Sequence, residues 1–233
     1  MRLMKNRSIN WLIRTQQINE VTSVATQTIL TPEWIEWGKQ QAAKFNNLEG
    51  FVAGEGGPDP KILLLGEAPG AKEIELGHPF QGPSGKELDR WLTTLSLTRE
   101  DVYIFGVVSS RPFRIGKSGL KSDRRPNNTE VKAFAPLFDY ELSQFKNKLL
   151  VTMGNASLQR LLGKDAKVGD LHGQLLHQPV QRYNEATGEF EWSDSKYDIF
   201  PLYHPSYSKR FKSIAPIVDE DSAKLKKLLA TLK

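Results

Sequence analysis

Four short, uninterrupted apolar runs dominate the pattern of hydrophobic and polar positions along this chain. They cover residues 62–65, 102–108, 149–153 and 199–203. Runs that do not alternate with polar residues are typical of strands buried on both faces of a parallel sheet. Because amphipathic stretches with helical spacing separate the runs, the pattern predicts an α/β protein whose sheet is covered by helices on both faces.

The stretches between the runs indicate individual helices and one hairpin. A capping box of Ser84 and Glu87 predicts a helix start, and residues 131–145 and 219–232 predict two further helices. Two short runs on either side of residues 187–188 predict a β-hairpin.

Residues 1–50 differ in pattern from the rest of the chain. Residues 32–45 have helical spacing, and Thr31 followed by Pro32 is a typical helix start. We therefore expect residues 1–50 to form an N-terminal helical extension and residues 51–233 to form the α/β domain.

Composition excludes several classes of chemistry. The 233 residues include no cysteine, which rules out disulfides, thiolate nucleophiles and cysteine-ligated zinc or iron–sulfur clusters. The four histidines are not spaced like a metal site, so we expect neither metal nor cofactor. No apolar run approaches the roughly 18 residues of a membrane helix, and no signal peptide is evident. We expect a cytoplasmic protein that is not associated with a membrane.

Positive charge is concentrated in one segment. The chain has a net charge of +5, and residues 105–132 alone carry seven basic residues against two acidic ones. These basic residues are Arg111, Arg114, Lys117, Lys121, Arg124, Arg125 and Lys132. The segment is also rich in Gly, Ser, Pro and Asn, so we expect a mobile loop. Such a loop favours contact with a nucleic-acid backbone, and a merely solvated surface loop is the alternative.

Candidate chemistry lies where two of the apolar runs end. Gly66-Glu67-Ala68-Pro69-Gly70 follows the first run, and His204-Pro205-Ser206 follows the last. In open α/β sheets, ligands bind at the carboxyl ends of the strands. The pattern thus predicts one site that contains a carboxylate and an imidazole. Phe80 lies between two prolines on a nearby glycine-rich loop, where it is either a stacking surface for a planar ligand or part of the core.

Taken together, five segments resemble the uracil-DNA glycosylase superfamily in order and spacing. The segments are GEAPGAKEIELGHPFQGPSG, VYIFGVVSSRPF, LLVTMGN, LHGQLL and LYHPSYSKR. The resemblance covers residue 60 to the C-terminus and is closest to family 4 and related bacterial members. It implies a three-layer α/β/α sandwich with a central four-stranded parallel sheet. It also implies monofunctional hydrolysis of the N-glycosidic bond of a base flipped out of DNA, most readily uracil.

The same resemblance implies roles for individual residues. Glu67 would orient or activate the attacking water, and His204 would stabilise negative charge on the departing base. Phe80 would stack on that base. The remaining base-binding positions would be Gly66, Ala68, Pro69, Gly70 and Gly106.

The implied partner is DNA, single- or double-stranded, bound by a monomer. Ser206 would contact phosphate, and the loop 205–210 would press into the minor groove. Together with the basic segment, the expected DNA-binding residues are Ser84, Arg111, Arg114, Lys117, Arg125, Ser206, Tyr207, Lys209 and Arg210.

The sequence departs from the family 4 pattern at several positions. Family 4 holds an iron–sulfur cluster with four cysteines, and here Ser110 stands where one of them is expected. Gly106 replaces an asparagine that reads the uracil edge, and Ser208 and Lys209 replace leucines that help to wedge the duplex. Two alternatives therefore stay open: a catalytically impaired DNA-binding homologue, and a glycosylase for another deaminated base.

Overall fold

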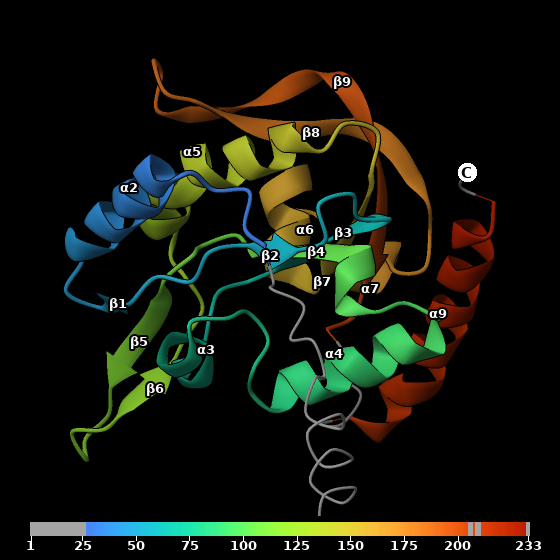
Figure 1. Cartoon of the computed structure of the whole chain (residues 1–233), viewed down its shortest axis with the longest axis horizontal. Coiled ribbons are helices and arrows are strands. Elements are labelled where there is room, and N and C mark those ends of the chain that lie inside the picture. The colour runs from blue at the N-terminus through green and yellow to red at the C-terminus, as the bar shows by residue number, and fades with distance from the viewer. Residues whose placement is uncertain (1–26, 205–206, 208–210, 232–233) are drawn as a thin grey trace, which may run out of the picture.

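A six-stranded mixed sheet forms the centre of the computed structural model, which describes residues 27–204, 207 and 211–231 (Figure 1). In sheet order the strands are β2 (Glu55–Gly56), β4 (Val102–Gly106), β3 (Ile62–Gly66), β7 (Leu149–Met153), β9 (Glu189–Leu202) and β8 (Leu176–Asn184). The inner four strands are parallel to one another, which confirms the predicted parallel sheet. Strands β2 and β8 pair antiparallel at the two edges; β2 was not predicted, and β8 is one strand of the predicted hairpin.

The predicted hairpin is present but longer than expected. Strands β8 and β9 form it, and β9 continues without a break from the hairpin turn to Leu202. The apolar run 199–203 and the short run after residue 188 therefore belong to a single strand. The exposed edge of the sheet is β8, whose ladder shifts register between Pro179 and Gln181.

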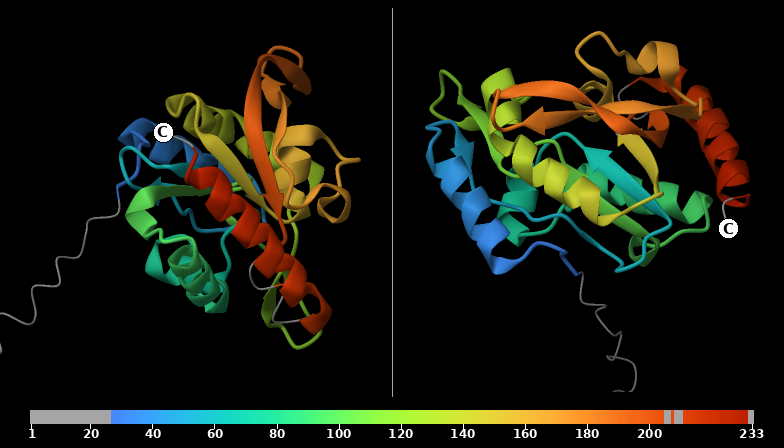
Figure 2. Two further views of the ribbon diagram at one scale, coloured as in Figure 1. Left: turned by 90° about the vertical axis from the view of Figure 1, so that its right-hand side faces the viewer. Right: turned by 90° about the horizontal axis from the view of Figure 1, so that it is seen from above.

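Helices cover both faces of this sheet, as Figure 2 shows from two further directions. One face carries α4 (Pro83–Thr94) and α9 (Ala215–Leu229). The other carries α2 (Pro32–Ala43), α5 (Asn128–Gln144) and α6 (Asn155–Leu162). Two short helices, α3 (Ala71–Leu76) and α7 (Val168–Leu171), lie in the connections. This arrangement confirms the three-layer α/β/α sandwich. No helix in the described part of the chain is long and apolar enough to cross a membrane.

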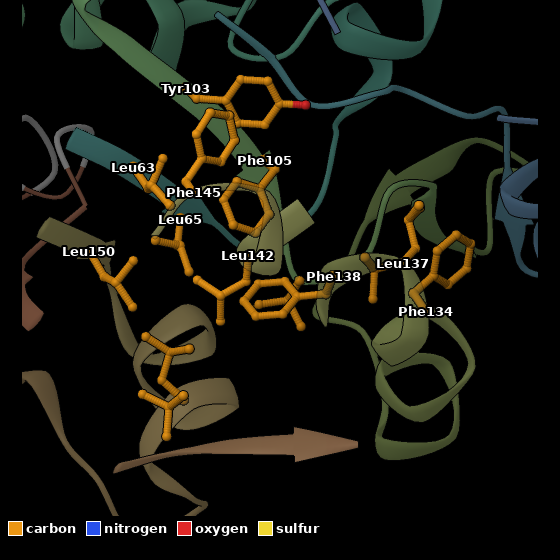
Figure 3. Packing of buried hydrophobic residues seen from close by; sticks show 14 of the residues in the cluster. Leu63, Leu65, Tyr103, Phe105, Phe134, Leu137, Phe138, Leu142, Phe145 and Leu150 are labelled. Atoms are coloured by element: carbon orange, nitrogen blue, oxygen red, sulfur yellow. The ribbon is translucent and has the colours of Figure 1, made fainter. Parts of the chain in front are cut away.

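Strand β3 explains why the apolar runs do not alternate. Leu63 and Leu65 pack with the side chains of α5 in one core cluster, which Figure 3 shows. Ile62 and Leu64 point to the opposite face and pack with α4 and α9. All four side chains are fully buried, so each position of the strand has to be apolar.

The helix expected at residues 32–45 forms as α2. The hydroxyl of Thr31 accepts a hydrogen bond from the backbone N–H of Trp34 at 3.4 Å, which caps the helix start. The Trp34 ring packs on Tyr140 of α5 with ring centroids 4.7 Å apart, and Ala42 is buried in the core. The described part of the N-terminal extension thus adds to the hydrophobic core. Residues 1–26 lie outside the described residues, and the boundary at residue 50 stays a prediction.

Helix α4 begins differently from the prediction. Its first residue is Pro83, its N-cap is Gly82, and that cap makes no side-chain hydrogen bond, so the capping box at Ser84 and Glu87 is wrong. The start is set instead by Pro83, whose fixed φ suits the first helical position, and by Glu73, whose carboxylate accepts from the Gly82 N–H at 3.0 Å.

The basic segment is a structured hairpin rather than the mobile loop that its composition predicts. Strands β5 (Arg111–Ile115) and β6 (Lys121–Asp123) pair antiparallel, and β5 also pairs with β1 (Leu48–Glu49). Arg111 is buried between Glu49 and Asp123, with N···O distances of 2.6 Å to each. This charged network fixes the hairpin to the body of the protein.

One carboxyl group lies in the core itself. Glu141 of α5 is fully buried, and its Oε1 accepts a hydrogen bond from the Tyr103 hydroxyl at 3.1 Å. Burial raises the pKa of Glu141 to about 8. The Glu141 side chain is therefore largely protonated at neutral pH.

Candidate active site

A cavity of about 650 Å³ opens at the carboxyl ends of the parallel strands. Strands β3, β4 and β9 all run toward this edge of the sheet, and the loops that follow them form much of its wall. Of the residues expected in the site, the cavity is lined by Gly66, Glu67, Ala68, Pro69, Gly70, Phe80, Ser84, Gly106, Arg125 and His204. The structure therefore brings together the ends of the first and last apolar runs, with Glu67 and His204 137 positions apart in sequence, as the pattern predicts.

The aromatic ring of Phe80 lies against His204 in this cavity. The two ring centroids are 5.8 Å apart, and the ring planes differ by 17°. Gly66 lies beneath the phenyl ring, because a Cβ built at that position would come within 3.3 Å of Phe80 Cε2. The glycine at the end of β3 thus allows the ring to lie directly on the strand end.

The backbone of Phe80 is held in a conformation that L-residues rarely adopt. Its φ is +54°, a value that costs energy unless neighbouring groups enforce it. Arg99 donates from Nη2 to the Phe80 carbonyl at 2.7 Å and from Nη1 to the Pro79 carbonyl at 3.0 Å. Asp89 accepts from Nε of the same guanidinium at 2.7 Å. The ring is consequently presented on a fixed loop.

Glu73 joins the two loops that carry Glu67 and Phe80. Its carboxylate accepts hydrogen bonds from the backbone N–H groups of Gly70, Gln81 and Gly82, at 3.1, 3.0 and 3.0 Å. Glu73 is not among the site residues predicted from the sequence. The available signal was its place three residues after Gly70, where an acidic side chain often caps a helix start.

Glu67 is half-buried on the wall of the cavity, with 36% of its side chain exposed. Burial raises the pKa of its carboxyl group, and the opposing effect of Arg125 does not cancel this shift. The nearest atoms of the pair, Arg125 Nε and Glu67 Oε1, are 3.5 Å apart, and the arginine side chain is largely exposed. The Glu67 carboxylate therefore accepts a proton more readily than an unperturbed glutamate does.

His204 follows β9 and reaches the cavity beside Gly154, the residue after β7. Burial lowers the pKa of the His204 imidazole. The ring is thus neutral at neutral pH, and one of its nitrogens carries a proton that it can donate in a hydrogen bond.

Gly106 leaves the floor of the cavity without a side-chain amide. It ends β4 directly beside Gly66, and a Cβ there would lie 3.0 Å from the Val108 carbonyl and 3.4 Å from that of Glu67. No asparagine or glutamine is present among the described residues that line the cavity. Ser109 is among the polar residues that line the cavity.

Apart from Ser84 and Arg125, which line the cavity, the residues expected to bind DNA fall into three groups. Arg114 and Lys117 are exposed on the β5–β6 hairpin, and Tyr207 is exposed beside Tyr203, with ring centroids 5.7 Å apart. Ser206, Lys209 and Arg210 lie outside the described residues. Arg111 is buried between two carboxylates, a position that supports a structural role and gives no support to a DNA contact.

The residues present do not fit the iron–sulfur cluster that family 4 implies. The chain has no thiolate to offer. Ser110, which stands at an expected cysteine position, is fully buried, and its hydroxyl has no hydrogen-bond partner in the described structure. No group of three or more His, Asp or Glu side chains in the described residues could hold a metal ion.

Comparison with known proteins identifies the family. The family model of the Uracil DNA glycosylase superfamily matches residues 53–233. The chain is 30% identical over 183 residues to the Type-4 uracil-DNA glycosylase of Sulfurisphaera tokodaii, covering 78% of this chain and 76% of the relative. It is also 30% identical over 186 residues to the Type-4 uracil-DNA glycosylase of Thermotoga maritima, covering 78% of this chain and 85% of the relative.

Among solved structures, SMUG2 of Pedobacter heparinus aligns with a TM-score of 0.49 at 14% identity, covering 94% of this chain and 98% of that one. The family match extends over more than half of the chain, and the relatives align over most of their length. This chain therefore belongs to the uracil-DNA glycosylase superfamily.

Proposed function

We propose that this protein is a monofunctional DNA glycosylase that hydrolyses the N-glycosidic bond of uracil flipped out of DNA. The observation that carries the proposal is the single cavity that joins a half-buried carboxylate, a neutral imidazole and a fixed aromatic ring. The relatives named uracil-DNA glycosylases support the choice of reaction and base.

In this proposal the flipped base stacks on Phe80. The bond between C1′ of the sugar and N1 of uracil breaks, and its electron pair stays on the base, where the charge spreads to O2. A neutral His204 donates a hydrogen bond to that oxygen, an interaction that strengthens as the charge develops. The site thereby lowers the barrier without forming a covalent bond to the substrate.

Glu67 acts on the attacking water molecule, whereas His204 acts on the departing base. A water molecule held by its carboxylate forms the new bond from oxygen to C1′, and its proton passes to Glu67. A carboxylate accepts a proton more readily when its pKa is raised, as burial raises that of Glu67. The products are an abasic site and the uracil anion, which takes up a proton from solvent on release while Glu67 returns its proton to solvent.

The proposed partner is DNA, and the proposed active form is a monomer in the cytoplasm. Ser84 and Arg125 lie at the cavity, where they can contact the backbone of the flipped nucleotide. Arg114, Lys117 and Tyr207 are exposed and are proposed as further contacts, together with Ser206, Lys209 and Arg210.

One observation favours a second candidate function. Gly106 supplies no amide to distinguish uracil from other bases, and a Cβ at that position would lie only 3.0 Å from the Val108 carbonyl. This arrangement suits a glycosylase for another deaminated base, such as hypoxanthine or xanthine.

A base-release assay tests both candidates. Uracil, hypoxanthine and xanthine are offered in single- and double-stranded DNA, with His204→Ala as the inactive control. We expect release of uracil by the wild-type protein, and release of a purine alone would select the second candidate. If DNA binds and no base is released, the enzyme proposal fails and a DNA-binding homologue remains.

A further inference from the structure

The β5–β6 hairpin carries two strongly exposed aliphatic side chains at its tip. Leu120 is 72% exposed and Ile115 is 66% exposed, more than any other large apolar residue in the described part of the chain. Both lie at the same end of the hairpin, where the Gly116 N–H donates to the Leu120 carbonyl at 2.9 Å and closes the turn. Figure 1 shows the hairpin extending beyond the body of the protein. Exposed aliphatic residues at one hairpin end indicate a contact surface.

This tip is held in place from its base. Arg111 is fixed by Glu49 and Asp123, and the Phe113 N–H donates to the Asn47 carbonyl at 3.0 Å. Lys121 forms an ion pair with Glu49 and lies 4.2 Å from the centroid of the Phe113 ring. These contacts tie both strands to β1, so the hairpin presents its apolar tip at a set position.

The base of the same hairpin borders the candidate active site. Pro112, Asp123 and Arg124 line the cavity. Ile115 lies three residues beyond Pro112 along β5, a separation of about 10 Å at roughly 3.4 Å per strand residue. If the hairpin lies along the DNA axis, at about 3.4 Å per base pair, its tip contacts DNA about three base pairs from a nucleotide held in the cavity.

The positive charge around the hairpin tip favours a partner that carries negative charge. Arg114 precedes Ile115, Lys117 stands between Ile115 and Leu120, and both cations are exposed. Aliphatic residues interspersed with cations match duplex DNA, whose phosphates attract the cations while isoleucine or leucine wedges between base pairs. The sequence also has Ser208 and Lys209 after His204, so aliphatic side chains for such a wedge are absent from that position.

We propose that the β5–β6 hairpin is a second DNA-contacting element, which inserts Ile115 and Leu120 into the duplex about three base pairs from the flipped nucleotide. Arg114 and Lys117 neutralise the neighbouring phosphates. This inference rests on the proposed function only in placing DNA at the cavity.

The test compares the wild-type protein with Ile115→Ser/Leu120→Ser, and uses Leu175→Ser as a matched control. Leu175 is also exposed, at 48%, and lies in the connection between α7 and β8. Fluorescence anisotropy measures the affinity for a uracil-containing duplex and for the same strand without its complement. We expect the double variant to bind the duplex on the order of 10- to 100-fold more weakly, the range for losing burial of one aliphatic side chain.

We expect the single strand to bind with unchanged affinity, and the control variant to match wild type on both ligands. Equal weakening on duplex and single strand would overturn the wedge, as would unchanged duplex affinity. A second measurement places 2-aminopurine at each position within about five base pairs of the uracil. We expect the wild-type protein to raise the 2-aminopurine fluorescence about three base pairs from the uracil, and the double variant to leave it unchanged. If the double variant raises the fluorescence as well, the proposal is contradicted.

An assay of base release distinguishes failure of this inference from failure of the proposed function. The double variant should release the base from single-stranded substrate at the wild-type rate, because its substitutions lie outside the cavity. If the wild-type protein releases no base and the double variant still loses duplex affinity, the wedge stands and the glycosylase proposal fails.

Discussion

The buried carboxyl of Glu141 predicts an unusual dependence of stability on pH. Its pKa is about 8 in the folded protein, against 4.5 for an unperturbed glutamate. The folded state therefore binds the proton more tightly than the unfolded state does. Its contribution to stability is fully present below pH 4.5 and is lost as the pH rises toward 8.

The size of this effect follows from the two pKa values. Each unit of difference corresponds to about 1.4 kcal/mol, so the full loss between the two values is on the order of 5 kcal/mol. That is a large fraction of the roughly 5–15 kcal/mol by which a typical domain is stable. Alkaline conditions should consequently weaken the fold through this single group.

Glu141→Gln removes the titration and keeps an oxygen that can accept from the Tyr103 hydroxyl. We expect the variant and the wild type to have similar free energies of unfolding at pH 5. At pH 9 the variant should be more stable by up to about 5 kcal/mol. Denaturant unfolding at pH 5, 6, 7, 8 and 9, followed by circular dichroism, measures the difference.

Glu185→Gln is the matched control, because it removes the same charge from the exposed turn between β8 and β9. The difference between Glu141→Gln and wild type should grow with pH, whereas that of the control should not. A difference for Glu141→Gln that stays constant from pH 5 to 9 would show that the buried carboxyl does not titrate in this range, and the reasoning from its burial would be refuted.

Three further predictions concern the site. His204→Ala should slow single-turnover base release by at least about 100-fold with little change in DNA affinity; equal rates would remove His204 from the mechanism. Phe80→Ala should weaken binding of uracil-containing DNA by roughly 1–3 kcal/mol, measured against undamaged DNA, and an equal loss on both would contradict stacking on the base. Replacing Arg114, Lys117 and Arg125 with glutamine should flatten the salt dependence of duplex binding by roughly 0.9 log units per lost phosphate contact, and an unchanged slope would exclude them from the interface.

The sequence pattern predicts the centre of this fold well because its strands are buried on both faces. Ile62 and Leu64 pack on one side and Leu63 and Leu65 on the other, so the apolar run is continuous and easy to recognise. The pairing of Glu67 with His204 could be predicted for a related reason, since the carboxyl ends of parallel strands meet at one edge.

The β5–β6 hairpin could not be predicted in the same way. Its polar composition is that of a loop, and its anchoring strand β1 is more than sixty residues earlier in the chain. The burial of Arg111 is also hidden in the sequence, because it depends on two carboxylates, Glu49 and Asp123, that only the folded chain brings together.

The register shift in β8 has a consequence for the behaviour of the protein at high concentration. An exposed edge strand offers unpaired backbone groups to other chains and is a common starting point for aggregation. In β8, Pro179 lacks an N–H group, and the shift between Pro179 and Gln181 interrupts the regular ladder. An incoming strand therefore cannot form a continuous set of hydrogen bonds along this edge. The irregularity thus protects the sheet from growing by intermolecular strand addition.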